Sequence, residues 1–180
     1  FGRVDLERIA LIGHSRGGEA VAHAAAFNNL RYYPDDATVE FDFHFNIQSL
    51  VAIAPSDQQY EPAGRPTELT DISYLLLQGS HDADVSSCLG LRQFQGVSFS
   101  GPGPWFKSLL YVGRANHGQF NTVWGRTDLP APVSHLLNLR PLLDGEDQRQ
   151  IAKTFIPAFL DLTLRRNETY RTLVRDYRQA

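Results

Sequence analysis

The sequence predicts an α/β fold in which a mostly parallel sheet carries helices on both faces. Short apolar runs that fit buried strands recur along the chain, at 9–12, 50–54, 74–79 and 106–112. Long loops or helix-forming segments separate these runs, which leaves room for the crossovers that parallel strands need. From position 144 onwards, apolar residues recur at helical spacing, so we expect a long amphipathic helix to pack on the sheet.

The first apolar run leads into a strand, a sharp turn and a helix. It is followed by a Gly-x-Ser-x-Gly pattern at 13–17 and by an alanine-rich segment at 19–26, which favours a helix ending near Asn28. A side chain in place of either glycine is expected to collide with the neighbouring strand or helix. In this context the pattern predicts a nucleophile elbow, which presents the hydroxyl of Ser15 to substrate.

The middle of the chain is expected to form a loop and then an extended segment. Proline and aspartate residues indicate a loop at 31–36. Apolar and polar residues alternate from Val39 to Ile47, which predicts a half-buried extended segment with His44 on its solvent side. The core strands at 50–54 and 74–79 follow.

The last part of the chain adds two helices and a strand. We expect a helix at 86–95, the strand at 106–112 and a proline-containing loop at 130–132. Asp144 has the features of an N-cap, and Pro157 is expected to kink the helix that follows it.

Length and composition indicate one domain and argue against several classes of partner. The 180 residues, 42% of them hydrophobic, suffice for a single domain spanning 1–180. A net charge of −3 with scattered charges gives no basic face, so we expect no nucleic-acid partner. No apolar run is long enough for a membrane span. Cys88 is the only cysteine and the six histidines are scattered, so the sequence predicts no disulfide, no metal site and no cofactor.

The predicted first strand begins at Ile9, close to Phe1, and the sequence contains no methionine. A parallel strand that is buried on both faces normally has neighbours on either side. We therefore expect an upstream segment of the same polypeptide to complete the sheet.

A general base for Ser15 is the next requirement, because a serine hydroxyl is a poor nucleophile until a base takes its proton. In parallel α/β sheets the reactive groups gather at the carboxyl ends of the strands. His117 lies directly after a predicted strand, beside Gly118, and is the favoured base. His81 is its rival, whereas His14 precedes the serine and is expected to point elsewhere.

An acid is needed to orient the base and to stabilise its protonated form. Asp82 follows the third core strand in a Gly-x-x-Asp-x-x-Val pattern and is favoured. Asp84 in the same loop and Asp57 after the preceding strand remain alternatives. The order serine, aspartate, histidine matches one of the known chain orders of such triads.

Three segments in this order resemble the α/β-hydrolase superfamily: Gly-His-Ser-Arg-Gly-Gly at 13–18, Gly-Ser-His-Asp-Ala-Asp-Val at 79–85 and Ala-Asn-His-Gly-Gln-Phe at 115–120. The first segment is similar to the elbow of chlorophyllase-like and dienelactone-hydrolase-like serine esterases. The resemblance covers about residues 6–120. It implies an α/β-hydrolase fold whose N-terminal strands are absent from this chain.

The resemblance also implies roles for individual residues. Ser15 is the nucleophile, Asp82 the acid and His117 the general base, and the backbone N–H of Arg16 is one oxyanion donor. The second donor of the family comes from a loop after an earlier strand, which this chain starts too late to contain.

The predicted function is therefore hydrolysis of a small-molecule carboxylic ester through an acyl-enzyme on Ser15. Gln58, Tyr60, Phe120 and Trp124 lie in loops near the strand ends and are candidate walls of the substrate pocket. Two alternatives remain open: a catalytically silent binding module with the same fold, and an acyltransferase that uses the same triad.

Overall fold

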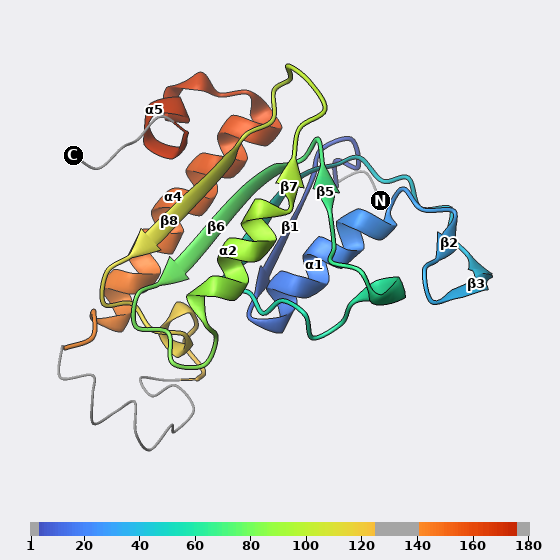
Figure 1. The fold of residues 1–180 in the computed structure, drawn as a ribbon. Helices are drawn as coiled ribbons and strands as arrows, with labels where there is room; N and C mark the ends of the chain where they lie inside the picture. The colour runs from blue at the N-terminus through green and yellow to red at the C-terminus, as the bar shows by residue number, and fades with distance from the viewer. Residues whose placement is uncertain (1–3, 125–140, 176–180) are drawn as a thin grey trace.

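The structure is a computed structural model that describes residues 4–124 and 141–175. Its centre is a four-stranded sheet with the strand order β1-β4-β6-β8. All neighbouring strands pair in parallel, which confirms the predicted parallel sheet (Figure 1). The predicted loop at 130–132 lies outside the described residues. The four strands are β1 (Ile9–His14), β4 (Ile47–Ile53), β6 (Ser73–Gly79) and β8 (Lys107–Val112).

Helices cover both faces of the sheet, as the sequence predicts (Figure 1). On one face lie α1 (Arg16–Phe27) and α2 (Ser87–Gln95). On the other lie α4 (Gly145–Arg165) and the short α5 (Arg171–Val174). None of the helices in the described part of the chain is long and apolar enough to cross a membrane.

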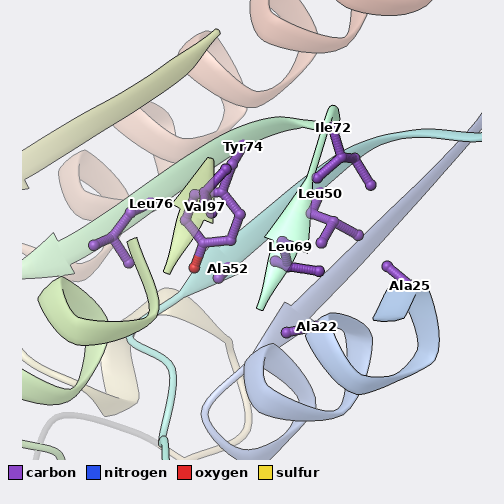
Figure 2. Packing of buried hydrophobic residues seen from close by; sticks show 9 residues of the cluster. All are labelled: Ala22, Ala25, Leu50, Ala52, Leu69, Ile72, Tyr74, Leu76 and Val97. Atoms are coloured by element: carbon purple, nitrogen blue, oxygen red, sulfur yellow. The ribbon is translucent and has the colours of Figure 1, made fainter. Parts of the chain in front are cut away.

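The pleat of the central strands explains why two layers of helices form. Successive side chains of a strand point to opposite faces, and the core strands are apolar on both. On β6, Tyr74 and Leu76 pack toward α1 and α2, whereas Leu75 and Leu77 pack toward α4. Figure 2 shows the first of these two clusters, made of Ala22, Ala25, Leu50, Ala52, Leu69, Ile72, Tyr74, Leu76 and Val97.

The long C-terminal helix begins where the sequence predicts. The Asp144 side chain accepts the N–H of Glu146 at 2.8 Å and so caps the first turn of α4. The helix continues through Pro157 to Arg165. Phe159 and Leu162 on its inner face are buried against the sheet.

Short elements connect these layers. They form an antiparallel hairpin, a small parallel pair and three single turns of 3₁₀ helix. The elements are β2 (Tyr32–Tyr33) with β3 (Asp36–Glu40), β5 (Leu69–Thr70) with β7 (Val97–Ser98), and η1 (Pro62–Gly64), η2 (Gly118–Phe120) and η3 (Glu168–Tyr170).

The segment from Val39 to Ile47 differs most from the predicted half-buried strand, although His44 is exposed as expected. Val39 lies in the exposed strand β3, and the core strand β4 already begins at Ile47. Between them, Phe43 and Phe45 are 50% and 51% exposed. Their rings stack on each other with centroids 6.3 Å apart, so the alternation reflects aromatic stacking along the segment and not a face buried on the core.

The outer edge of the sheet at β1 has no strand partner among the described residues, because β1 pairs with β4 alone. The side chain of Ile12, near the end of this strand, is 49% exposed. The expectation that an upstream segment pairs with β1 stays a prediction.

Candidate active site

Ser15 occupies the sharp turn between β1 and α1. Its backbone has φ 59° and ψ −124°, a conformation that L-residues rarely adopt and that costs about 1–3 kcal/mol. Main-chain hydrogen bonds to the end of β4 hold it there. The Ser15 N–H donates to the Ile53 carbonyl at 2.9 Å, and the Ser15 carbonyl accepts the N–H of Ser56 at 3.1 Å. The neighbouring strand thus supports the strained turn.

The glycines around Ser15 have unequal roles. A Cβ added to Gly13 would lie 2.0 Å from the carbonyl oxygen of Gly17, so the expected collision is confirmed there. At Gly17 an added Cβ would meet nothing within 4 Å, so the same expectation is wrong for that position. The second close approach is at Gly18, where an added Cβ would lie 2.7 Å from the Cβ of Pro55. The helix therefore packs on the strand ends through Gly18.

Asp82 and His117 meet at the carboxyl ends of β6 and β8. His117 Nδ1 lies 2.9 Å from Asp82 Oδ2, and the two side chains are only 2% and 0% exposed. The other oxygen, Asp82 Oδ1, accepts the N–H groups of Asp84 at 3.0 Å and Val85 at 2.7 Å. An ionised carboxylate only accepts hydrogen bonds, so this geometry suits the His117 tautomer in which Nδ1 carries the proton.

The alternative acids and the alternative base are engaged elsewhere. Asp57 forms an ion pair with Arg92 at 2.5 Å. Asp84 is exposed and contributes its backbone N–H to Asp82. His81 Nδ1 lies 2.8 Å from the hydroxyl of Ser80 in the same loop. Of the residues weighed from the sequence, Asp82 and His117 are the pair that the structure brings together.

His14 was expected to point away from this region, and the structure corrects that expectation. Its ring centroid lies 4.7 Å from that of His117 and 4.9 Å from that of Trp124. The ring of Phe120 lies 6.1 Å away, edge-on. The residue directly before Ser15 is therefore in contact with the loop that carries His117, which brings the ends of β1 and β8 together above the two strands between them.

The candidate pocket walls divide into two groups. Trp124 lies almost parallel to the His117 ring, with centroids 5.8 Å apart and an interplanar angle of 12°, and is 53% exposed. Phe120 lies edge-on to His14, whose ring is in turn close to that of His117. Gln58 is exposed in the loop after β4.

Tyr60 lies away from the pair, against the middle of α1. Its ring packs on His23 with centroids 5.1 Å apart, and its hydroxyl bonds to Tyr33 and donates to Asp35. Burial, followed by the hydrogen bond to Asp35, raises the pKa of the Tyr60 hydroxyl above its ordinary value. These contacts tie the β2–β3 hairpin to α1, and we assign Tyr60 no contact with the Asp82–His117 pair.

Sequence reasoning missed three buried polar residues that support the site. Glu19 on α1 accepts the hydroxyl of Ser56 at 2.8 Å and the N–H of Gln59 at 2.8 Å. Gln78, in β6, donates to Asp82 Oδ2 at 3.3 Å. Gln148 on α4 bonds to the main chain of the His117 loop, as described below. Their shared signal is a polar residue at a position that the apolar pattern assigns to the core.

The described residues contain no group of three or more histidine, cysteine, aspartate or glutamate side chains able to hold a metal ion.

Comparisons with known proteins find similarity to solved structures. The esterase domain of a Rhodothermus marinus protein is 20% identical with a TM-score of 0.38, over 60% of this chain and 50% of that one. A bifunctional GH43-CE protein of Bacteroides eggerthii is 14% identical with a TM-score of 0.41, over 62% and 21%. MGS-M1, an α/β hydrolase enzyme from a Medee basin deep-sea metagenome library, is 16% identical with a TM-score of 0.48, over 90% and 57%.

The chain thus spans between about a fifth and about three fifths of the length of these three proteins. No protein-family model and no curated protein sequence matches it. The strand order, the parallel pairing and the helices on both faces define an α/β fold with a parallel central sheet. What the site does follows from this chain's own contacts.

Proposed function

We propose that the protein is a serine hydrolase that cleaves a carboxylic ester through an acyl-enzyme on Ser15. The observation that carries the proposal is the buried hydrogen bond between Asp82 and His117. Ser15 lies in a strained strand-to-helix turn, and the residue before it, His14, has its ring centroid 4.7 Å from that of His117. A serine, a histidine and an aspartate at the carboxyl ends of three parallel strands can act as nucleophile, base and orienting acid.

In the acylation step, His117 Nε2 takes the proton of the Ser15 hydroxyl while Oγ forms a bond to the ester carbonyl carbon. The tetrahedral intermediate then collapses, the bond from the carbonyl carbon to the alcohol oxygen breaks, and His117 returns the proton to the departing alcohol. Water repeats these steps on the acyl-enzyme and releases the acid. Asp82 holds the imidazole and stabilises its protonated form throughout.

The negative oxygen of the tetrahedral intermediate needs hydrogen-bond donors. We propose the backbone N–H of Arg16 as one of them. It opens α1, where the helix dipole favours negative charge, and it forms no hydrogen bond with any described residue. Each such donor is worth about 10²–10³-fold in turnover.

Phe120 and Trp124 are proposed as walls of the pocket near His117. Half of the Trp124 surface is exposed although its ring stacks on His117. If this assignment holds, Trp124→Ala raises KM more than it lowers kcat in steady-state assays with esters of bulky alcohols. An unchanged KM for every ester would contradict the assignment.

The direct test is covalent labelling with a fluorophosphonate probe, which reacts with activated serines. Labelling of the wild-type protein and its loss in Ser15→Ala, with a drop in esterase activity of about 10⁴-fold or more, are expected. Ser100→Ala serves as the matched control. Ser100 is exposed and bonds to Asp71, which precedes β6, whereas Asp82 follows the other end of that strand. Absence of labelling in a folded wild-type protein would favour a silent binding module. Products formed with added alcohols or amines would identify an acyltransferase.

A further inference from the structure

Gln148 is a buried polar side chain of α4 that bonds to the loop carrying His117. It is fully buried, one turn into the helix. Its Nε2 donates to the carbonyl of Asn116 at 2.8 Å, and its Oε1 accepts the N–H of Asn116 at 3.1 Å. The amide therefore pairs with both main-chain groups of the residue immediately before His117, as a neighbouring strand would.

Further contacts hold the same loop on the start of α4. The side chain of Gln119 donates to the Leu143 carbonyl at 3.0 Å, and the N–H of Gln119 donates to Asn116 Oδ1 at 3.2 Å. Arg149 donates to the Gln119 carbonyl at 3.4 Å. Within this set, the Gln148 amide is the group that bonds to the main chain directly adjoining His117.

We propose that Gln148 is a positioning residue for His117, acting by fixing the main chain of Asn116 so that the imidazole keeps its contact with Asp82 and its orientation toward Ser15. The inference rests on the proposed serine-hydrolase function. Its physical basis is the steep dependence of catalysis on geometry, since a displacement of about 1 Å can lower the rate by about 10²-fold. Gln148 acts in this proposal through the main chain of Asn116.

A positioning role and a merely structural one predict different kinetics. Gln148→Met keeps the size and shape of the side chain but removes both hydrogen bonds. We expect kcat to fall by about 10–100-fold with KM within about twofold of wild type. The matched control is Thr163→Val, which removes another buried hydrogen bond on α4, from Thr163 to the Phe159 carbonyl at 2.9 Å. Thr163→Val is expected to lower the unfolding temperature without changing kcat.

Gln148→Glu is a conservative variant, and the pH decides whether its carboxyl group is neutral or ionised. A buried glutamic acid in its neutral form has one O–H donor and one carbonyl acceptor, which match the two groups of the glutamine amide. The ionised form cannot donate, and it would face the Asn116 carbonyl. Ionisable residues near this position include His117, which follows Asn116, the N-cap residue Asp144, and Arg149 on α4.

The pH profile of this variant follows from its two forms. Burial raises the pKa of the introduced carboxyl, so the neutral form persists below that pKa and is lost as the pH rises through it. We expect the kcat of Gln148→Glu to approach that of wild type on the acid side and to decline on the alkaline side, a limb that the wild-type profile lacks. A profile parallel to that of wild type at all pH values would overturn the proposal.

A spectroscopic measurement separates this inference from the proposed function. The His117 Nδ1 proton, hydrogen-bonded to Asp82, gives a downfield proton resonance in the NMR spectrum, whether or not the protein hydrolyses esters. We expect the resonance to persist in Thr163→Val and to weaken or broaden in folded Gln148→Met. An unchanged resonance in Gln148→Met overturns the positioning role. A wild-type protein that shows the resonance but neither labels nor hydrolyses contradicts the proposed function and leaves the positioning of His117 supported if Gln148→Met loses the signal.

Discussion

The turn that carries Ser15 and the loop that carries His117 lie close together in the site but are held by different kinds of contact. Main-chain hydrogen bonds to β4 and close packing at Gly13 and Gly18 fix the turn. Side chains from other elements fix the loop, chiefly Asp82 and Gln148. The comparison teaches that Ser15, the proposed nucleophile, is placed by backbone geometry, whereas His117, the proposed base, is placed by long-range polar contacts.

The largest effect is expected when the side-chain contact that holds the His117 loop is removed. Asp82→Asn keeps the shape of the acid but offers an amide that can donate to Nδ1, which favours the wrong tautomer of His117. We expect kcat/KM for ester hydrolysis to fall by about 10⁴-fold while the protein stays folded. Asp84→Asn, in the same loop but exposed, is the control and should stay within a few-fold of wild type. Equal losses in both variants would contradict the assignment of the acid.

The next largest effect is expected when the close backbone packing at the Ser15 turn is disturbed. Gly13→Ala places a methyl group 2.0 Å from the Gly17 carbonyl oxygen, so something must move. We expect the free energy of unfolding to fall by about 3 kcal/mol or more, measured by urea titration. Gly17→Ala meets no atom within 4 Å and lies in the first turn of α1, so it should be neutral or stabilising by up to about 1 kcal/mol. Similar losses for both glycines would refute the unequal roles.

A third prediction sharpens the comparison, because the turn has one side-chain support as well. Glu19 is buried and accepts hydrogen bonds from Ser56, Gln59 and Tyr60 in the loop after β4. Glu19→Ala leaves three donors without this acceptor and is expected to lower the free energy of unfolding by about 2–3 kcal/mol. Glu19→Gln keeps an acceptor oxygen and should lose only about 1 kcal/mol. Thermal unfolding of the two variants compares their losses of stability. A larger loss in Glu19→Gln than in Glu19→Ala would contradict the proposal that Glu19 stabilises the loop after β4.

The smallest effect concerns the end of the helix from which Gln148 acts. Asp144→Ala removes the bond to the Glu146 N–H and should lower the free energy of unfolding by about 1 kcal/mol. Asp144→Ser retains a capping oxygen and should recover most of that loss. Urea titration of both variants is the measurement, and a loss of the same size in Asp144→Ser would argue against capping.

The sequence predicts the sheet, its covering helices and the turn at Ser15 because these depend on local patterns. A buried strand needs an apolar run, and the turn needs a glycine where another backbone segment approaches within 2.0 Å of a Cβ position. The N-cap at Asp144 is local in the same sense. Each of these signals lies within a few residues of the feature that it predicts.

The remaining errors concern contacts between distant segments. The hydrogen bonds from Gln148 to Asn116 span 32 residues, and no spacing rule points from one to the other. The contacts of His14 could not be predicted from its position before Ser15, because its partners Phe120 and Trp124 come more than a hundred positions later in the chain. The alternation around Phe43 gave a wrong prediction for a related reason. Alternating apolar residues are buried only where another element of the fold packs against them.

The hydrogen bonds between Gln148 on α4 and Asn116 in the His117 loop also affect the order in which the site forms during synthesis. Translation proceeds from the N-terminus, so β1, α1 and the turn at Ser15 emerge early and can form with β4 soon afterwards. Asn116 receives its partner only when residue 148 has left the ribosome. In the nascent chain, the turn at Ser15 can therefore form well before the main chain beside His117 has its partner on α4. Helix α4 is the element whose arrival completes the proposed site.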